Sequence, residues 1–253
     1  MNTITMTGAG RKLLAVAACA ATFGLTGAAT PASALGSTPR GTRPATATGT
    51  SGCAGAQVKV RVHDEALRRE ATLANLVTKL QARRDPFAMN GPQISALQSA
   101  SAGITALDGQ IASTCYPTLA ALRADAKKLF VDYRVYWLRG PQTHAIEAAD
   151  RLAEARARLG DAAAKLAPLV GSNATAQGDL AAMNQALAAA DAKLGTAPTA
   201  GPALAPVPGL APSADMSSDT AALRAARTDL LAVRAALATA RADGLKVVTD
   251  LHG

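Results

Sequence analysis

Most of this 253-residue chain carries apolar residues at alternating intervals of three and four, and this spacing restricts the fold more than any other feature. The intervals follow the 3.6-residue turn of an α-helix, so each row of apolar residues lies on one helix face. No segment alternates strictly enough between apolar and polar residues to predict a strand. The sequence therefore predicts an all-α protein. The longest row consists of Leu223, Ala226, Leu230, Val233, Leu237, Ala240, Gly244, Val247 and Leu251.

Six helical segments are expected, and residues that favour turns separate most of them. The sequence predicts helices over residues 58–84, 97–115, 117–139, 149–166, 180–194 and 223–251. Alanine occupies many positions of the apolar rows, which indicates that the helices pack closely and nearly antiparallel. We therefore expect an antiparallel helical bundle or a short coiled coil with Pro/Gly-rich linkers.

The path of the chain at Gly140-Pro141 is open to two interpretations. If the apolar row before this dipeptide continued in the same register, it would place Thr143, Glu147 and Asp150 on the apolar face. The next apolar row is instead shifted by about two positions, which corresponds to a rotation of about 200°. A hairpin turn is the favoured interpretation, and a sharply kinked continuous helix is the alternative.

Residues 1–34 have the organisation of a secretory signal peptide. Arg11 and Lys12 precede an apolar run, and the small residues of Ala32-Ser33-Ala34 predict cleavage before Leu35. A lipoprotein site at Cys19 is the less favoured alternative, because the apolar run continues beyond it. No later segment is long and apolar enough to span a membrane, so we expect a protein secreted into an extracytoplasmic compartment.

The expected mature chain has three parts. Residues 35–56 form a flexible N-terminal arm, because their small and polar residues cannot bury a core. Residues 57–168 form a helical bundle, and residues 169–253 form a C-terminal helical hairpin with a low-complexity linker at 196–213.

Cys53 and Cys115 are the two cysteines that remain after signal cleavage. An even number of cysteines in an oxidising compartment predicts one disulfide. If the first two helices form an antiparallel hairpin, both cysteines lie at the same end of that hairpin. The disulfide would then staple the 57–168 bundle.

An aromatic cluster near the middle of the chain is the best candidate for a binding site. It contains four of the six aromatic residues that follow the expected cleavage site, and basic residues border it. A plug in the core is the favoured interpretation, because aromatic rings fill space between helices rich in alanine. The alternative is a binding groove. The candidate binding residues are Tyr133, Arg134, Tyr136, Trp137, Arg139 and His144.

Charge and motifs exclude several classes of function. Without Arg11 and Lys12 the chain holds 24 basic and 18 acidic residues, a net charge of +6 that is dispersed along the sequence. Few aromatic residues and no Lys/Arg block argue against nucleic-acid binding. The histidines lie far apart and no metal-binding, nucleophile or phosphate-loop motif occurs, so we expect no metal, no cofactor and no enzymatic activity.

A row of three arginines seven residues apart lies beside the last apolar row. Arg227, Arg234 and Arg241 could bind an acidic partner. The favoured interpretation is that they pair with Asp229 or Asp243 and cover the apolar row with their stems.

One segment of the chain resembles a known family. The element Tyr133-Arg134-Val135-Tyr136 is followed by Leu138, Pro141 and Ala148-Ala149-Asp150. In this pattern the chain is similar to a family of uncharacterised secreted helical proteins of actinobacteria, and the end from Leu223 to Leu251 is similar too. The resemblance implies secretion and a helical fold, and it implies no particular activity. Trp137 and Arg139-Gly140 depart from the aliphatic residues of the family.

These observations predict a secreted, non-enzymatic helical protein of the bacterial cell envelope or exterior that acts in structure or interaction. An unknown protein or an anionic envelope polymer would be its partner. The alternative is a carrier that uses amphipathic helices to hold a hydrophobic ligand or to lie on a lipid surface.

Overall fold

A computed structural model of the chain describes residues 53–213 and 216–252. The predicted signal peptide, including Cys19, and residues 35–52 of the predicted arm lie outside these described residues. The structure confirms the all-α class. Its α-helices are α1 Ala56–Gln81, α2 Asn90–Ser113, α3 Leu119–Val131, α4 Gly140–Leu166, α5 Ala174–Leu194 and α6 Ser217–His252.

Short irregular elements join these helices. A π-helical turn, η2, spans Val135–Arg139 and leads directly into α4. The linker between α5 and α6 contains the two-residue antiparallel strands β1 Gly195–Thr196 and β2 Thr199–Ala200 and the 3₁₀ turn η3 Val207–Gly209. Residues 196–213, predicted as a low-complexity linker, thus include a small hairpin and a buried turn at Val207 and Pro208.

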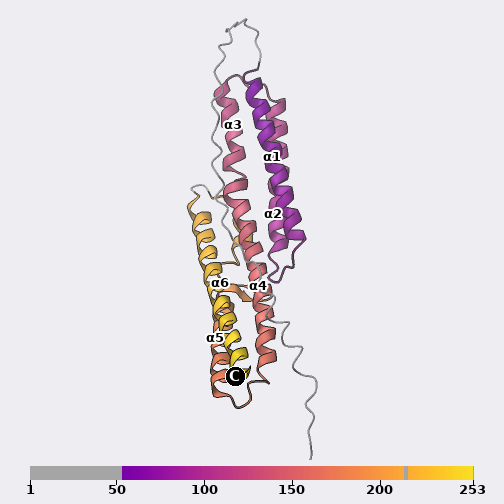
Figure 1. The fold of residues 1–253 in the computed structure, drawn as a ribbon. Helices are drawn as coiled ribbons and strands as arrows, with labels where there is room; N and C mark the ends of the chain where they lie inside the picture. Colours follow the sequence, from indigo (N-terminus) through magenta and orange to yellow (C-terminus); the bar gives the residue numbers. More distant parts are fainter. Residues whose placement is uncertain (1–52, 214–215, 253) are drawn as a thin grey trace, which may run out of the picture. The chain divides into compact units, whose positions relative to one another are not determined.

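Helices α1 and α2 form an antiparallel hairpin (Figure 1). Polar pairs between the two helices fix the register. His63 Nδ1 lies 2.7 Å from Asp108 Oδ2, and Thr105 donates a hydrogen bond to Glu70 at 2.6 Å. The apolar rows predicted from the sequence form the seam. Its fully buried members include Leu73, Leu80, Leu97, Ile104 and Ile111.

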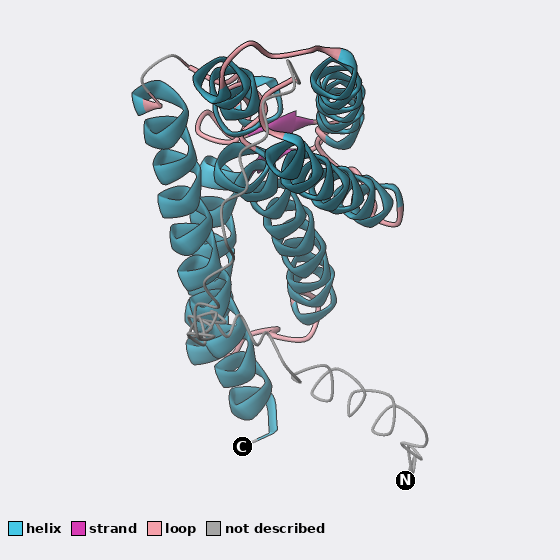
Figure 2. Ribbon diagram, turned by 90° about the horizontal axis from the view of Figure 1, so that it is seen from above, coloured by secondary structure: helices cyan, strands magenta, loops and turns pink. Residues whose placement is uncertain are grey.

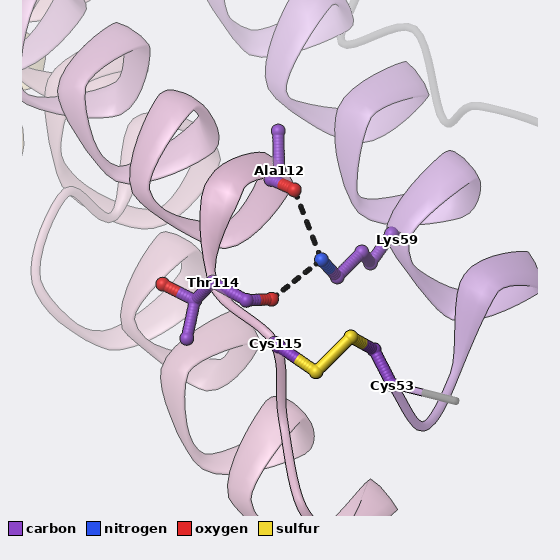
Figure 3. Close-up of a disulfide and its surroundings, with 5 residues drawn as sticks. All are labelled: Cys53, Lys59, Ala112, Thr114 and Cys115. Atoms are coloured by element: carbon purple, nitrogen blue, oxygen red, sulfur yellow. Dashed lines mark hydrogen bonds between the residues drawn. A yellow bond between two sulfur atoms is a disulfide. The ribbon is translucent and has the colours of Figure 1, made fainter. Parts of the chain in front are cut away.

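The disulfide Cys53–Cys115 closes the open end of this hairpin (Figure 3). The two Cα atoms lie 4.8 Å apart, and the predicted pairing of these cysteines is confirmed. Beside the disulfide, Lys59 Nζ donates hydrogen bonds to the carbonyls of Ala112 at 2.9 Å and Thr114 at 2.6 Å. These bonds satisfy carbonyls that the end of α2 leaves without a partner in the helix.

A second group of packed helices consists of α4, α5 and α6. Figure 2, which views the structure along another axis, shows that helices make up most of the described chain. Arg156 of α4 forms a bidentate ion pair with Asp191 of α5, and Lys193 of α5 pairs with Asp229 of α6. The predicted row of α6 faces inward, because Ala226, Val233, Ala240 and Val247 are fully buried.

The favoured hairpin turn at Gly140-Pro141 is wrong, because the chain stays helical through this dipeptide. Gly140 donates its N–H to the carbonyl of Val135, which closes the π-helical turn, and α4 begins at Gly140 itself. Pro141 lies in the first turn of α4, where a missing N–H costs little. The regular helix is instead interrupted earlier, at Arg134, whose φ of 42° is left-handed.

Helix α4 belongs to both groups of helices. Its first turns contact α1 and α2, and it also packs against α5 and α6. Residues 51–253 accordingly form one compact unit, and the division predicted at residue 168 falls inside it.

Candidate interaction surface

The six predicted binding residues all lie in or beside η2, but they do not form one site. Tyr136 and Trp137 point outward, Arg134 is buried, and Tyr133 and Arg139 are half-buried. His144 is exposed on the first turn of α4, where its ring lies 3.4 Å from Glu147. The structure thus divides the cluster into an outer aromatic part and an inner basic part.

The predicted aromatic core plug is wrong for three of the four rings. Trp137 is 75% exposed, Phe130 is 53% exposed and Tyr136 is 48% exposed. Tyr133 alone packs inward, against Gly103 of α2. A Cβ atom at Gly103 would lie 2.5 Å from Cε1 of Tyr133, so only glycine permits this approach.

Phe130, Tyr136 and Trp137, which we call the aromatic patch, gather where α3 ends and η2 begins. A buried cation holds two of these rings in place: the Arg69 guanidinium lies 4.4 Å from the centre of the Phe130 ring and 4.9 Å from that of Tyr136. Cation–π contacts at these distances are favourable. Arg69 therefore contacts two of the three rings from the buried side, while all three rings are open to solvent.

Arg69 is itself buried and held by hydrogen bonds. It is 4% exposed, donates from Nε to Glu65 at 2.8 Å, and donates from Nη1 to the carbonyl of Leu129 at 3.1 Å. The last bond satisfies a carbonyl in the final turn of α3. The sequence prediction missed Arg69, although it occupies a position on the apolar row that runs through Val62, Ala66 and Leu73.

Arg134 is a structural residue rather than a ligand-binding one. Its Nη1 lies 2.9 Å from Asp219 at the start of α6, Nη2 donates to the carbonyl of Ser213, and Nε donates to the carbonyl of Val131. Burial alone would raise the pKa of Asp219, but hydrogen bonds from Ser213, Arg134 and the Thr220 N–H outweigh it and lower that pKa. The pair joins the bend before η2 to the first turn of α6.

Arg139 has a similar anchoring role. It donates to the carbonyl of Leu210 at 3.2 Å and to the side chain of Gln142 at 3.2 Å, and burial lowers the pKa of its guanidinium. Gln142, which is fully buried, donates to the carbonyls of Val207 at 2.8 Å and Leu210 at 2.9 Å. These bonds fasten the linker around η3 to α4.

A buried polar cluster lies where α4 packs against α2, and the sequence prediction did not identify it as a cluster. Gln93 of α2 donates to Thr143 of α4 at 3.2 Å, and both side chains are completely buried. Asp150 is 1% exposed, and neither of its carboxylate oxygens has a hydrogen-bond partner. The Asn90 amide lies near Asp150 and partly stabilises the charge of the carboxylate. The Oδ1 atom of Asn90 has no hydrogen-bond partner either.

Burial raises the pKa of Asp150 to about 7, and the negative charges of Asp85 and Glu154 act in the same direction. Arg83 and Asn90 oppose the shift without cancelling it. At neutral pH this carboxyl is therefore partly protonated, and its O–H can satisfy one of the unpartnered oxygens around it. The cluster consists of amide, hydroxyl and carboxyl side chains on the packed faces of α2 and α4.

Two hollows in the surface are candidate ligand sites for the predicted carrier. One, of about 360 Å³, lies between α4 and α5 and is lined by alanines and the Arg156–Asp191 pair. The other, of about 280 Å³, lies between α1 and α4, and Lys79, Arg83 and Arg151 line it together with Glu147. Charged groups line both hollows, and this does not suit a purely apolar ligand.

The arginines of α6 are not paired as predicted. Asp229 pairs with Lys193 at 3.1 Å and Asp243 pairs with Lys246 at 2.6 Å. Arg227, Arg234 and Arg241 are exposed, and none has a carboxylate within ion-pair distance in the described part of the chain. These arginines are therefore available to another molecule.

Within residues 53–213 and 216–252, no group of three or more His, Cys, Asp or Glu residues is arranged to hold a metal ion. None of the helices described there is long and apolar enough to cross a membrane. Comparison with known protein families, with curated proteins and with solved structures found no match to this chain.

Proposed function

We propose that this protein is a secreted, non-enzymatic interaction module of the bacterial cell envelope or exterior, and that the aromatic patch is its main contact surface. One observation carries the proposal: Phe130, Tyr136 and Trp137 are exposed together, and Arg69 fixes two of them from below. Aromatic residues and arginine dominate the binding energy of protein interfaces.

The contacts of Arg69 beneath the patch add to this argument. Ordering a flexible side chain at an interface costs about 0.5–1.5 kcal/mol. The contacts of Arg69 with Phe130 and Tyr136 order those rings before any partner arrives. A patch that existed only to stabilise the fold would turn its rings inward instead, as half-buried Tyr133 does against Gly103.

The disulfide supports the proposed location. Disulfides persist in oxidising compartments and are rare in the cytosol, and Cys53–Cys115 is compatible with export. Intact-mass measurement of protein from culture supernatant tests this location. We expect a mass that begins at Leu35 and lacks two hydrogens, and a lipid-modified product that begins at Cys19 and stays with membranes would contradict it.

The contact surface is tested by retention on immobilised protein. Culture supernatant and isolated cell envelopes would be passed over the wild type, over Trp137→Ala, and over Leu169→Ala as the matched control. Leu169 is 46% exposed but lies after α4, away from η2. We expect Trp137→Ala to lose at least about tenfold of any retained component, which is the range of an interface hot spot.

Trp137 also provides a direct readout, because it is the only tryptophan in the chain. A partner that covers the aromatic patch should shift its fluorescence to shorter wavelength and protect it from acrylamide quenching. If a retained component leaves the fluorescence of Trp137 unchanged and binds the Trp137→Ala variant equally well, the aromatic patch is not the contact surface.

A further inference from the structure

One flank of α6 is exposed along most of the helix and carries a regular row of residues. Its members lie alternately three and four residues apart, which is the heptad spacing of a helix that pairs with another helix. This row, which we call the arginine row, starts one position after the buried seam of the same helix. It consists of Arg224, Arg227, Leu231, Arg234, Ala238, Arg241 and Leu245, all of them exposed.

The charge of the arginine row is unbalanced. Each of the four acidic residues of α6 is buried or half-buried, namely Asp219, Asp229, Asp243 and Asp250. Three of them are engaged elsewhere, with Arg134, Lys193 and Lys246. Among the described residues the arginines of the row have no carboxylate within ion-pair distance, so the surface presents positive charge only.

Leu231 and Leu245 are apolar members of the same row. They are 55% and 50% exposed, respectively, although α6 has a complete buried seam without them. They lie two heptads apart, with the small residue Ala238 midway between them. A linear polyanion would bind the arginines and would not need leucines in this register, whereas a second helix would pack against them.

From these observations we propose that the arginine row of α6 binds an acidic amphipathic helix of another protein. Such a helix would set apolar residues against Leu231, Ala238 and Leu245 and would place glutamates or aspartates opposite the arginines. The row runs over 22 residues, from 224 to 245, so at a rise of about 1.5 Å per residue the partner helix must extend about 30 Å, or three heptads.

This proposal concerns a different surface from the aromatic patch, so the two can fail independently. The probe is a synthetic peptide of four heptads with leucine on its seam and glutamate on both flanks. Its like charges keep it from pairing with itself. The first control peptide carries lysine in place of glutamate, and the second has the composition of the probe in a scrambled order that removes the heptads.

Binding would be measured by fluorescence anisotropy of the labelled peptide at physiological salt, with the full mature protein and its disulfide intact. We expect the acidic helix to bind and to gain helicity, and both control peptides to bind at least about tenfold more weakly. If the scrambled peptide binds as tightly as the acidic helix, the arginine row recognises negative charge alone and the proposal is wrong. Absence of binding by all three peptides would also overturn it.

Two variants of the protein separate charge from packing. Arg227→Glu with Arg234→Glu should raise the dissociation constant for the acidic helix at least about tenfold, and Leu231→Gln with Leu245→Gln should do the same without changing the charge. The matched control is Arg61→Glu with Arg158→Glu, since both arginines are exposed on other helices. It should leave binding unchanged.

Two further outcomes would overturn the proposal. If the leucine variant binds like the wild type, no helix packs on the row. If Trp137→Ala weakens peptide binding as much as the arginine variant does, the peptide lies on the aromatic patch instead. Circular dichroism of each variant verifies that its helices remain folded, because every substituted residue is on the surface.

Discussion

At the scale of single residues, the polar side chains inside the core were the least predictable part of the molecule. Arg69, Glu147 and Asp150 all occupy buried helix faces. For Arg69 the pattern itself contained the signal, because Ala66 three positions before it and Leu73 four positions after it are apolar. Glu147 and Asp150 led to the opposite error: their polarity indicated that the apolar face ended at Gly140-Pro141, whereas the face continues and buries them.

Asp150→Asn should make the protein more stable at high pH. Because the folded pKa of Asp150 is about 7, above the ordinary value of 3.8, the folded state holds a proton that the unfolded state loses first. Stability therefore falls as pH rises from about 4 to 7 and then levels off. We expect the variant to exceed the wild type by about 2–4 kcal/mol at pH 8 and to match it near pH 4.

The measurement is urea unfolding of both proteins across this pH range, and the difference between them isolates Asp150. Other carboxylates have the opposite dependence. Hydrogen bonding to His144 lowers the pKa of Glu147, and that of Asp219 is lowered as well, so their stabilisation is lost as pH falls. A constant difference between wild type and variant at all pH values would show that the pKa of Asp150 is the same in the folded and unfolded states.

The ion pair between Arg134 and Asp219 should be the most sensitive polar contact. Arg134→Ala leaves Asp219 buried without its cation, and such a loss costs about 3–5 kcal/mol of unfolding free energy. Arg139→Ala is the matched control, because Arg139 donates hydrogen bonds only to a carbonyl and an amide oxygen. Its cost should be about 1–2 kcal/mol, as measured by denaturant unfolding, and equal losses in the two variants would contradict the assignment.

At the scale of elements, apolar spacing in the sequence predicted most of the helices. It did not predict how the chain connects α3 to α4. Rows such as Leu97, Ala100 and Ile104 fixed both the helix and its buried face. The bend before η2 gave no comparable signal, because Arg134 adopts a left-handed φ at which glycine is expected. The outward direction of Tyr136 and Trp137 depends on this bend and on the π-helical turn, so local spacing could not predict the aromatic patch.

The disulfide stabilises one element, the hairpin of α1 and α2. It closes a loop over a sequence separation of 62, for which chain entropy predicts a contribution of about 4 kcal/mol. Cys53→Ser with Cys115→Ser should lower the unfolding free energy by about 2–4 kcal/mol and keep most helicity, since the apolar seam remains. Thiol titration of the denatured, unreduced wild type should find no free thiol, and two free thiols would refute the bond.

At the scale of the whole molecule, helix α4 joins helices that the sequence assigned to separate parts. It contacts α1 and α2 near its start and also packs against α5 and α6. Neither set of helices can lose α4 without exposing buried apolar residues such as Ile146 and Leu166. The boundary at residue 168 was predicted from the linkers and stays a prediction, and α4 packs against helices on both sides of it.

We therefore expect the described helices to unfold together. Fluorescence of Trp137 reports the region of η2, and far-ultraviolet circular dichroism reports all helices. The two probes should give coincident transitions in urea, as a single cooperative unit requires. Two separated transitions would indicate that α5 and α6 unfold independently of the disulfide-stapled hairpin.

The left-handed Arg134 has a consequence for how the sequence can evolve. Glycine would relieve the backbone at this position, but it would remove the cation on which the buried Asp219 depends. A lineage that acquires glycine at 134 must therefore replace the acid at 219 in the same step or soon afterwards. The two positions, 85 residues apart, should change together among descendants of this chain, and an uncharged residue at one should accompany an uncharged residue at the other.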